Sequence, residues 1–174
     1  RILSSGSRTN PWMQESSNKI IQEGEIVSFD TDMVGPYGYC ADISRAFVCG
    51  NKFNEYQKKL YQTAVEQIDY NSRLIKAGVT FKEFTEKAWI LPEKYYGNRY
   101  SVMLHGIGLC DEWPAIRYPT DGGERGGTFQ KNMTITLESY IGEVGGNEGV
   151  KLEQQYLVGE NGLELMSHHP LEKI

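Results

Sequence analysis

Residues 26–48 decide the fold, and they read IVSFDTDMVGPYGYCADISRAFV. Two strand-like runs, residues 26–34 and 39–48, are separated by a break that is rich in glycine and proline. This pattern predicts a β-hairpin with a longer loop. Two further strands are predicted at residues 133–138 and 150–158, so we expect an α+β fold with an antiparallel sheet.

Acidic side chains occur on all of these predicted strands. Because residues i and i+2 of a strand face the same way, Asp30 and Asp32 share one face, and Asp42 lies on the paired strand. Glu138 and Glu153 lie on the two later strands. A carboxylate in an apolar strand is costly to bury unless a positive charge compensates it. A bound cation would provide that positive charge. For each carboxylate considered by itself, the alternative is a position on a solvent-exposed strand face.

Two helices are predicted between the strand pairs. Over residues 54–77, apolar side chains recur at every fourth position, and Gly78 is suited to end that helix. Thr80 together with Glu83 forms a capping-box pattern for a second helix that continues to about Leu91.

The stretch from Gly97 to Gly127 is rich in glycine, and we expect it to be a long functional loop. It contains His105, which is followed by Gly106 and Gly108, residues that allow the backbone to approach a site closely. A lone histidine beside apolar residues is more often structural than a ligand. Together with five strand carboxylates, however, one imidazole suits Mn, Fe, Co or Zn.

Length and composition exclude several classes of protein. The 174 residues, 39% hydrophobic and 24% charged, suffice for one core but not for two full domains. The net charge of −5 without a basic cluster argues against nucleic acid, and no apolar run approaches the roughly 20 residues of a membrane span. Cys40, Cys49 and Cys110 lack metal-binding or disulfide spacing, which favours a cytoplasmic protein.

The six candidate ligands resemble, in their order, the metal-ligand series of the pita-bread metallopeptidase superfamily, which includes methionine aminopeptidases, prolidases and creatinases. They are Asp30, Asp32, Asp42, His105, Glu138 and Glu153. The ligands of that superfamily run Asp, Asp, His, Glu, Glu and hold two cations. The resemblance implies an α+β pita-bread catalytic domain, truncated at its N-terminal side. Residues 1–174 would form most of that domain and would lack its first part and a separate N-terminal domain.

The sequence departs from the peptidase pattern in three places. Here Asp42 follows Asp30 by twelve residues and Asp32 by ten. The spacing between the two Asp ligands of the peptidases lies between these two values. They also carry a histidine upstream of the first Asp, and residues 8–12 contain none. A second histidine of prolidase-like enzymes corresponds to Glu112.

In these three places the sequence resembles one branch of the superfamily. The members of that branch are lyases that cleave dimethylsulfoniopropionate (DMSP) to dimethyl sulfide and acrylate by β-elimination. That resemblance implies two divalent metal ions, assigned as iron, with all six residues above as ligands, and a homodimer that acts on a small molecule. It also implies that Asp111 is the catalytic base, although an Asp can instead cap the turn before Pro114. Aromatic faces bind sulfonium, so Tyr100, Trp113 and Trp12 are candidate substrate-binding residues, with plain packing as the alternative.

The sequence is also compatible with two other functions. A dinuclear metallopeptidase of the Xaa-Pro peptidase or aminopeptidase type would use the same metals, but it normally needs the two missing histidines to stabilise its tetrahedral intermediate. A non-catalytic metal-binding relative is the second alternative. Such relatives usually lose ligands, and six intact candidates argue against this reading.

Overall fold

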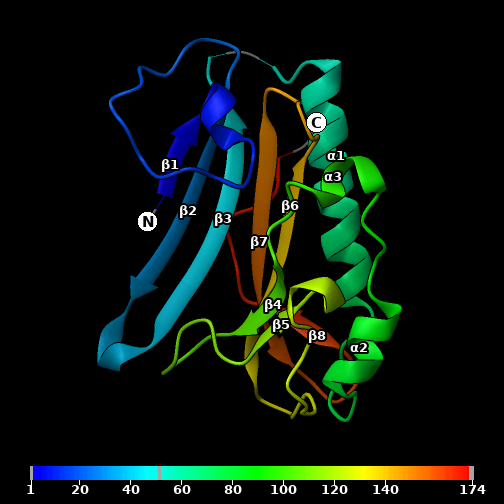
Figure 1. The fold of residues 1–174 in the computed structure, drawn as a ribbon. Coiled ribbons are helices and arrows are strands. Elements are labelled where there is room, and N and C mark those ends of the chain that lie inside the picture. The colour runs from blue at the N-terminus through cyan, green and yellow to red at the C-terminus, as the bar shows by residue number, and fades with distance from the viewer. Residues whose placement is uncertain (1, 51, 173–174) are drawn as a thin grey trace.

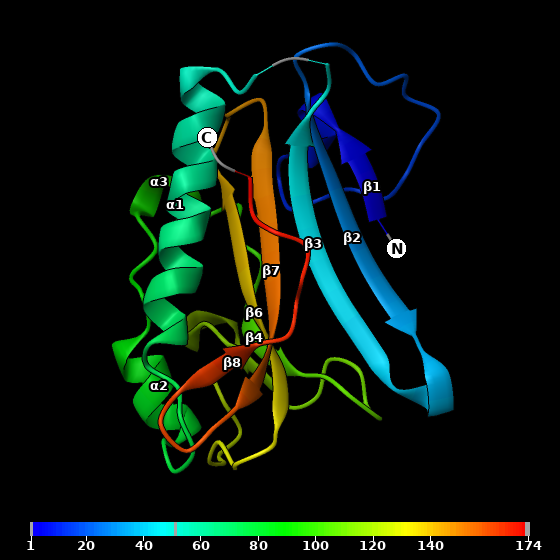
Figure 2. The same ribbon diagram turned by 180° about the vertical axis from the view of Figure 1, so that it is seen from behind.

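Two antiparallel sheets lie side by side, with strands β3 and β7 facing each other (Figures 1 and 2). The computed structural model describes residues 2–50 and 52–172. The first sheet has the order β1-β2-β3, formed by Ile2–Ser5, Ile26–Val34 and Cys40–Val48. The second has the order β5-β4-β6-β7-β8, formed by Ala115–Arg117, Val102–Gly106, Thr134–Gly142, Gly149–Val158 and Leu163–Leu165. The expected α+β class with antiparallel strands is therefore confirmed.

The register of the strands places the acidic side chains opposite one another. In the first sheet Asp32 pairs with Asp42 across the hairpin. In the second sheet Glu138 pairs with Glu153, and His105 lies opposite Thr136 on the next strand. Cross-strand partners have Cβ atoms about 5 Å apart, so each sheet brings its own candidate ligands together. The adjacency of β3 and β7 then brings the two groups to one junction.

Helix α1, Glu55–Ser72, packs against β6 and β7 and covers one face of the larger sheet (Figure 2). Its N-cap is Asn54, which exchanges two hydrogen bonds with Gln57 in a capping box. Leu60, Ala64 and Ile68 form its buried face and belong to the hydrophobic core. None of the helices in the described ranges has the length and apolar character that a bilayer crossing requires.

Helix boundaries differ from the sequence expectation. Helix α1 ends at Ser72 rather than near residue 77, because the amides of Ala77 and Gly78 donate to Gly159 O and Phe129 O on neighbouring segments instead of to the helix. Helix α2, Phe81–Lys87, begins with the expected capping box but ends before Leu91. A short helix α3, Glu93–Tyr96, follows after residues 88–92.

The prediction of an irregular loop from residue 97 to residue 127 was wrong for part of its length. The stretch contains β4, a central strand between β5 and β6, and every residue of β4 is buried. A strand that is buried on both faces has no alternation of polar and apolar residues, so the pattern that reveals half-exposed strands is missing. The stretch also contains β5, and residues 107–114 form the loop that joins β4 to β5.

Candidate metal centre

His105 lies at the centre of the junction between the two sheets and is 1% exposed. Its Nε2 atom is 3.3 Å from Glu138 Oε1, 3.5 Å from Glu153 Oε1 and 3.7 Å from Asp42 Oδ2. Its Nδ1 atom lies 3.0 Å from the carbonyl oxygen of Gly106. Because a carbonyl oxygen only accepts, Nδ1 carries a proton, and this leaves Nε2 directed at the carboxylates as a metal ligand would be.

The backbone around His105 is held by an unusually close contact. A Cβ atom on Gly106 would lie 2.2 Å from the carbonyl oxygen of Trp113, so only glycine fits there. The amide of Gly106 donates to Pro114 O at 2.9 Å. This contact brings the two ends of the 107–114 loop together directly beside the histidine.

The carboxylates at the junction are buried and perturb one another. Burial, followed by the charge of Glu153, raises the pKa of Asp42 far above its usual value. Burial likewise raises the pKa of Glu138 to about 7. Burial alone would raise the pKa of Glu153, but Lys151 and His105 outweigh it and lower that pKa. These buried carboxylates therefore require compensation by positive charge.

The donor set fits divalent cations. Asp42 Oδ1 and Glu153 Oε1 are buried and receive no hydrogen bond from any group in the described part of the chain. Two trios of ligand atoms share Asp42, one completed by His105 and Glu153 and the other by Asp32 and Asp111, and within each trio the atoms lie within 4.8 Å of one another. Orphaned carboxylate oxygens beside one imidazole are suited to transition-metal ions. Two adjoining trios provide room for two such ions.

The structure places Asp30 differently from the other candidate ligands. Its Oδ1 atom accepts a hydrogen bond from Ser44 Oγ and lies 3.6 Å from Lys151 Nζ. It belongs to neither trio. Lys151, which is 1% exposed, also lies 2.6 Å from Glu138 Oε2 and donates to Ser44 Oγ at 2.7 Å. Burial acts to lower the pKa of Lys151, but the surrounding carboxylates raise it well above its usual value.

Two of the three candidate aromatic residues lie together next to this group. The rings of Trp12 and Tyr100 stack at 3.9 Å with an interplanar angle of 8°, and Tyr140 contacts Trp12 edge-on. Lys151 Nζ lies 5.1 Å from the centre of the Trp12 ring and 5.6 Å from that of Tyr100. The stacked pair therefore borders the charged site.

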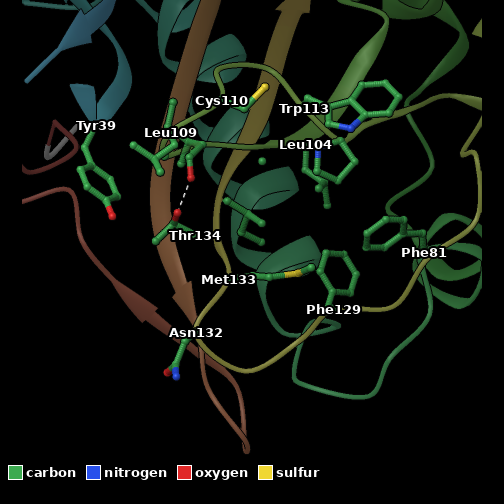
Figure 3. Close-up of a pocket in the computed structure, with 15 residues that line it drawn as sticks. Tyr39, Phe81, Leu104, Leu109, Cys110, Trp113, Phe129, Asn132, Met133 and Thr134 are labelled. Carbon is green, nitrogen blue, oxygen red and sulfur yellow. Dashed lines mark hydrogen bonds between the residues drawn. The ribbon is translucent and has the colours of Figure 1, made fainter. Parts of the chain in front are cut away.

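Trp113 lies elsewhere, in a mainly apolar cavity of about 350 Å³ between the 107–114 loop, the start of β6 and the region of α2 (Figure 3). Phe81 and Phe129 line the same cavity, and Trp113 is 54% exposed. None of the six candidate ligands is among the described residues that line it. The structure therefore separates Trp113 from Trp12 and Tyr100.

Sequence reasoning missed Lys151 as part of the site. A signal for it was present, because Lys151 precedes Glu153 by two residues and so shares its strand face. A lysine in a strand that is otherwise buried needs nearby groups that compensate its charge, and the strand carboxylates are such groups.

These features define a class of protein. The chain belongs to metallopeptidase family M24, whose sequence model matches residues 1–160. Members of this family are dinuclear metal-dependent proteins, and the chain carries a possible carboxylate–histidine site of that kind. The resemblance to the pita-bread superfamily is thereby confirmed.

Both lyases and peptidases are among the known proteins that are similar to this chain. The chain is 41% identical to dimethylsulfoniopropionate lyase DddP of Roseovarius nubinhibens and 39% identical to that of Roseobacter denitrificans, in each case over 99% of this chain and 39% of the relative. It is 32% identical to an Xaa-Pro dipeptidase of Pyrococcus horikoshii, over 99% of this chain and 48% of that protein. Among solved structures, the prolidase of Pyrococcus furiosus is similar, with a TM-score of 0.78 and 30% identity over 94% of this chain and 47% of that one. The chain thus spans about two fifths of the length of the two lyases.

Proposed function

We propose that this chain is the metal-binding part of a lyase that cleaves DMSP to dimethyl sulfide and acrylate. Similarity to the two proteins named DddP supports this proposal. The structural observation that carries it is the position of Asp111, whose carboxylate lies within 4.8 Å of those of Asp32 and Asp42 although it comes from a separate loop. A carboxylate that lies close to Asp32 and Asp42, but on its own loop, is suited to take a proton from a substrate held there.

The reaction requires a base, a site for the substrate carboxylate and a site for the sulfonium. Asp111 accepts the proton from the carbon next to the carboxylate, the electrons of that C–H bond form the new double bond, and the C–S bond electrons leave with dimethyl sulfide. Two divalent cations, when bound, would stabilise the negative charge that develops on the substrate carboxylate. The stacked Trp12 and Tyr100 provide aromatic surface for the sulfonium beside the same site.

The loop that carries Asp111 is held in place at both sheets. The amide of Cys40, at the start of β3, donates to Gly108 O at 2.7 Å, which ties the loop to the β2–β3 hairpin. Within the loop, Glu112 has a left-handed φ of 55°, and its amide donates to Asp111 Oδ1 at 3.1 Å. These contacts support a defined position for the Asp111 carboxylate, as a base needs.

The finer features of the proposal follow from the same resemblance. We propose iron as the native metal, with Mn, Co or Zn also compatible with an oxygen-rich set that includes one imidazole. We also propose a homodimer in the cytoplasm, without a nucleic-acid or membrane partner. Three free cysteines among the described residues are consistent with a reducing compartment.

A dinuclear Xaa-Pro peptidase is the second candidate, because the dipeptidase of P. horikoshii and the prolidase of P. furiosus are also similar to this chain. Its mechanism would use the same metal ligands. The residue at the position of the second prolidase histidine is Glu112, and a carboxylate accepts hydrogen bonds where an imidazolium would donate them.

The test is to supply DMSP to the iron-loaded protein and to measure headspace dimethyl sulfide together with acrylate in solution. We expect both products in equal amounts. The variant Asp111→Asn should lower the rate by about 10²-fold or more while the metal content stays unchanged, whereas Glu112→Gln, the matched change on the same loop, should remain active. Loss of metal in Asp111→Asn would make Asp111 a ligand. Release of proline from Xaa-Pro dipeptides without dimethyl sulfide would establish the peptidase instead.

A further inference from the structure

The cavity of about 350 Å³ beside Trp113 has the size and the lining of a small-molecule site. Such sites usually measure about 300–1,000 Å³ and are lined mainly by apolar and aromatic side chains. Here the rings of Phe81, Phe129 and Trp113 and the side chain of Met133 gather along one side (Figure 3). At about 30 Å³ for each non-hydrogen atom, which is the volume of a water molecule in the liquid, the cavity holds an apolar group of about ten atoms.

Three large apolar side chains that line this cavity are exposed. Leu109 is 71% exposed, Tyr39 56% and Trp113 54%. Scattered apolar side chains on a surface are ordinary, whereas apolar side chains that gather around a hollow mark a binding surface. A ligand in the cavity would cover these side chains.

The cavity and the metal centre lie on different sides of the 107–114 loop. Leu109 and Trp113 line the cavity, whereas the carboxylate of Asp111 lies within 4.8 Å of those of Asp32 and Asp42. A ligand of the cavity is therefore distinct from the metal ions and from the substrate of the proposed function.

A second hollow of about 340 Å³ adjoins the cavity and is more polar. The two hollows share the side chains of Phe81, Trp113 and Met133 as a common wall. The second one, which we call the polar hollow, is also lined by residues 125–128, an arginine, two glycines and a threonine. Together the two hollows form a site that is apolar at one end and polar at the other.

Arg125 provides a positive charge at the polar hollow. Its guanidinium carbon lies 5.7 Å from the centre of the Trp113 ring, and within residues 2–50 and 52–172 it pairs with no carboxylate. Glu124, its neighbour in sequence, instead accepts a hydrogen bond from the amide of Gly126. No acidic side chain in the described part of the chain lines either hollow. A guanidinium without a counter-ion beside an apolar cavity is complementary to a carboxylate on an apolar body.

We propose that the cavity and the polar hollow bind a monocarboxylate with an unbranched aliphatic chain, which lies in the cavity while its carboxylate pairs with Arg125. The site uses Trp113 for apolar contact with this chain rather than for a sulfonium. It includes none of the candidate metal ligands and not Asp111, so it does not depend on the proposed function.

The first test measures the size of the site. Straight-chain carboxylates from butyrate to dodecanoate are titrated into the metal-loaded protein by calorimetry. Affinity should rise about three- to fourfold with each added CH₂, because each buried CH₂ adds a similar increment, and should level off near ten carbons, when the cavity is full. A continued rise to dodecanoate would indicate adsorption to an open surface, and no binding of decanoate at millimolar concentration would remove the site. Either result overturns the inference.

The second test separates the charged end from the apolar end. Arg125→Gln changes an exposed side chain and should weaken octanoate about tenfold or more, while the affinity for octanol, which has no charge, stays unchanged. Trp113→Ala should weaken both ligands. Arg73→Gln, the matched control on α1, should alter neither.

Equal affinity of octanoate for Arg125→Gln and for the unaltered protein would show that another group, such as a bound metal ion, holds the carboxylate, and would refute the site. Sedimentation of the same samples tests a different occupant. Conversion of a dimer to monomers by octanoate would show that a second copy of the chain fills the cavity, which also contradicts the inference.

Discussion

Replacing Arg45 with methionine tests how the two sheets are joined behind the metal centre. Arg45 lies on β3 and is 3% exposed, and its guanidinium donates across the junction to Glu153 O at 2.6 Å, Gln154 Oε1 at 2.5 Å and His169 O at 2.5 Å. Methionine retains much of the volume but donates no hydrogen bond. Three acceptors would lose their partner at about 1–3 kcal/mol each, offset in part because a buried charge is also removed.

We therefore expect Arg45→Met to lower the free energy of unfolding by about 3–5 kcal/mol. The assay is urea denaturation in the presence of a chelator, followed by circular dichroism, so that metal loss does not contribute. The midpoint should fall without a change in slope. Arg73→Met is the matched control, because the Arg73–Asp69 pair is mostly exposed and should contribute less than about 1 kcal/mol. A loss below about 1 kcal/mol for Arg45→Met would contradict the assigned role of Arg45 in joining the sheets.

Three further predictions concern stability. Gly106→Ala would place a methyl group 2.2 Å from Trp113 O and should cost about 3 kcal/mol or prevent folding, measured as soluble yield and thermal midpoint. Asn54→Ala removes the capping box of α1 and should cost about 1 kcal/mol in urea denaturation; no change would show that the cap is dispensable. Burial raises the pKa of Tyr118 and of Tyr156 to about 12, whereas unfolded tyrosine ionises near 10. At pH values between these two pKa values only the unfolded state loses the proton, so the free energy of unfolding should fall as pH rises. The expected fall is about 1.4 kcal/mol per pH unit for each tyrosine, measured from denaturation curves recorded at pH 9 to 12.

The hairpin and the two later strands could be predicted from sequence because each has a recognisable local pattern. Strands β2 and β3 flank turn-forming residues, and β6 and β7 are long runs of strand-forming residues. Strand β4 could not be found in this way, since burial on both faces removes its alternation. The end of α1 depends on hydrogen bonds to residues 129 and 159, which are distant in sequence.

The metal centre shows the same division between local and distant information. Spacing within a strand was enough to place Asp30 with Asp32 on one face. It could not show that Lys151, more than a hundred residues later, would lie beside Asp30 but not in the Asp32 trio. Likewise, Trp113 and Asp111 are close in sequence, yet Trp113 lines a different cavity from the metal centre. The direction of a side chain at a junction of two sheets depends on tertiary contacts between segments that are distant in sequence.

The junction itself has a consequence for how the protein responds to metal starvation. Strand β3 is the edge of its sheet, and β8 pairs with β7 only from Tyr156 to Val158, so most of the free edge of β7 faces β3. A cation held by Asp42 on one side and by His105 and Glu153 on the other would act as a cross-link between these two edges. Without it, the edges are joined by fewer contacts, and unpaired strand edges are templates for aggregation. We therefore expect chelation to accelerate amide hydrogen exchange in the β2–β3 hairpin first and to increase light scattering, both reversed by added metal.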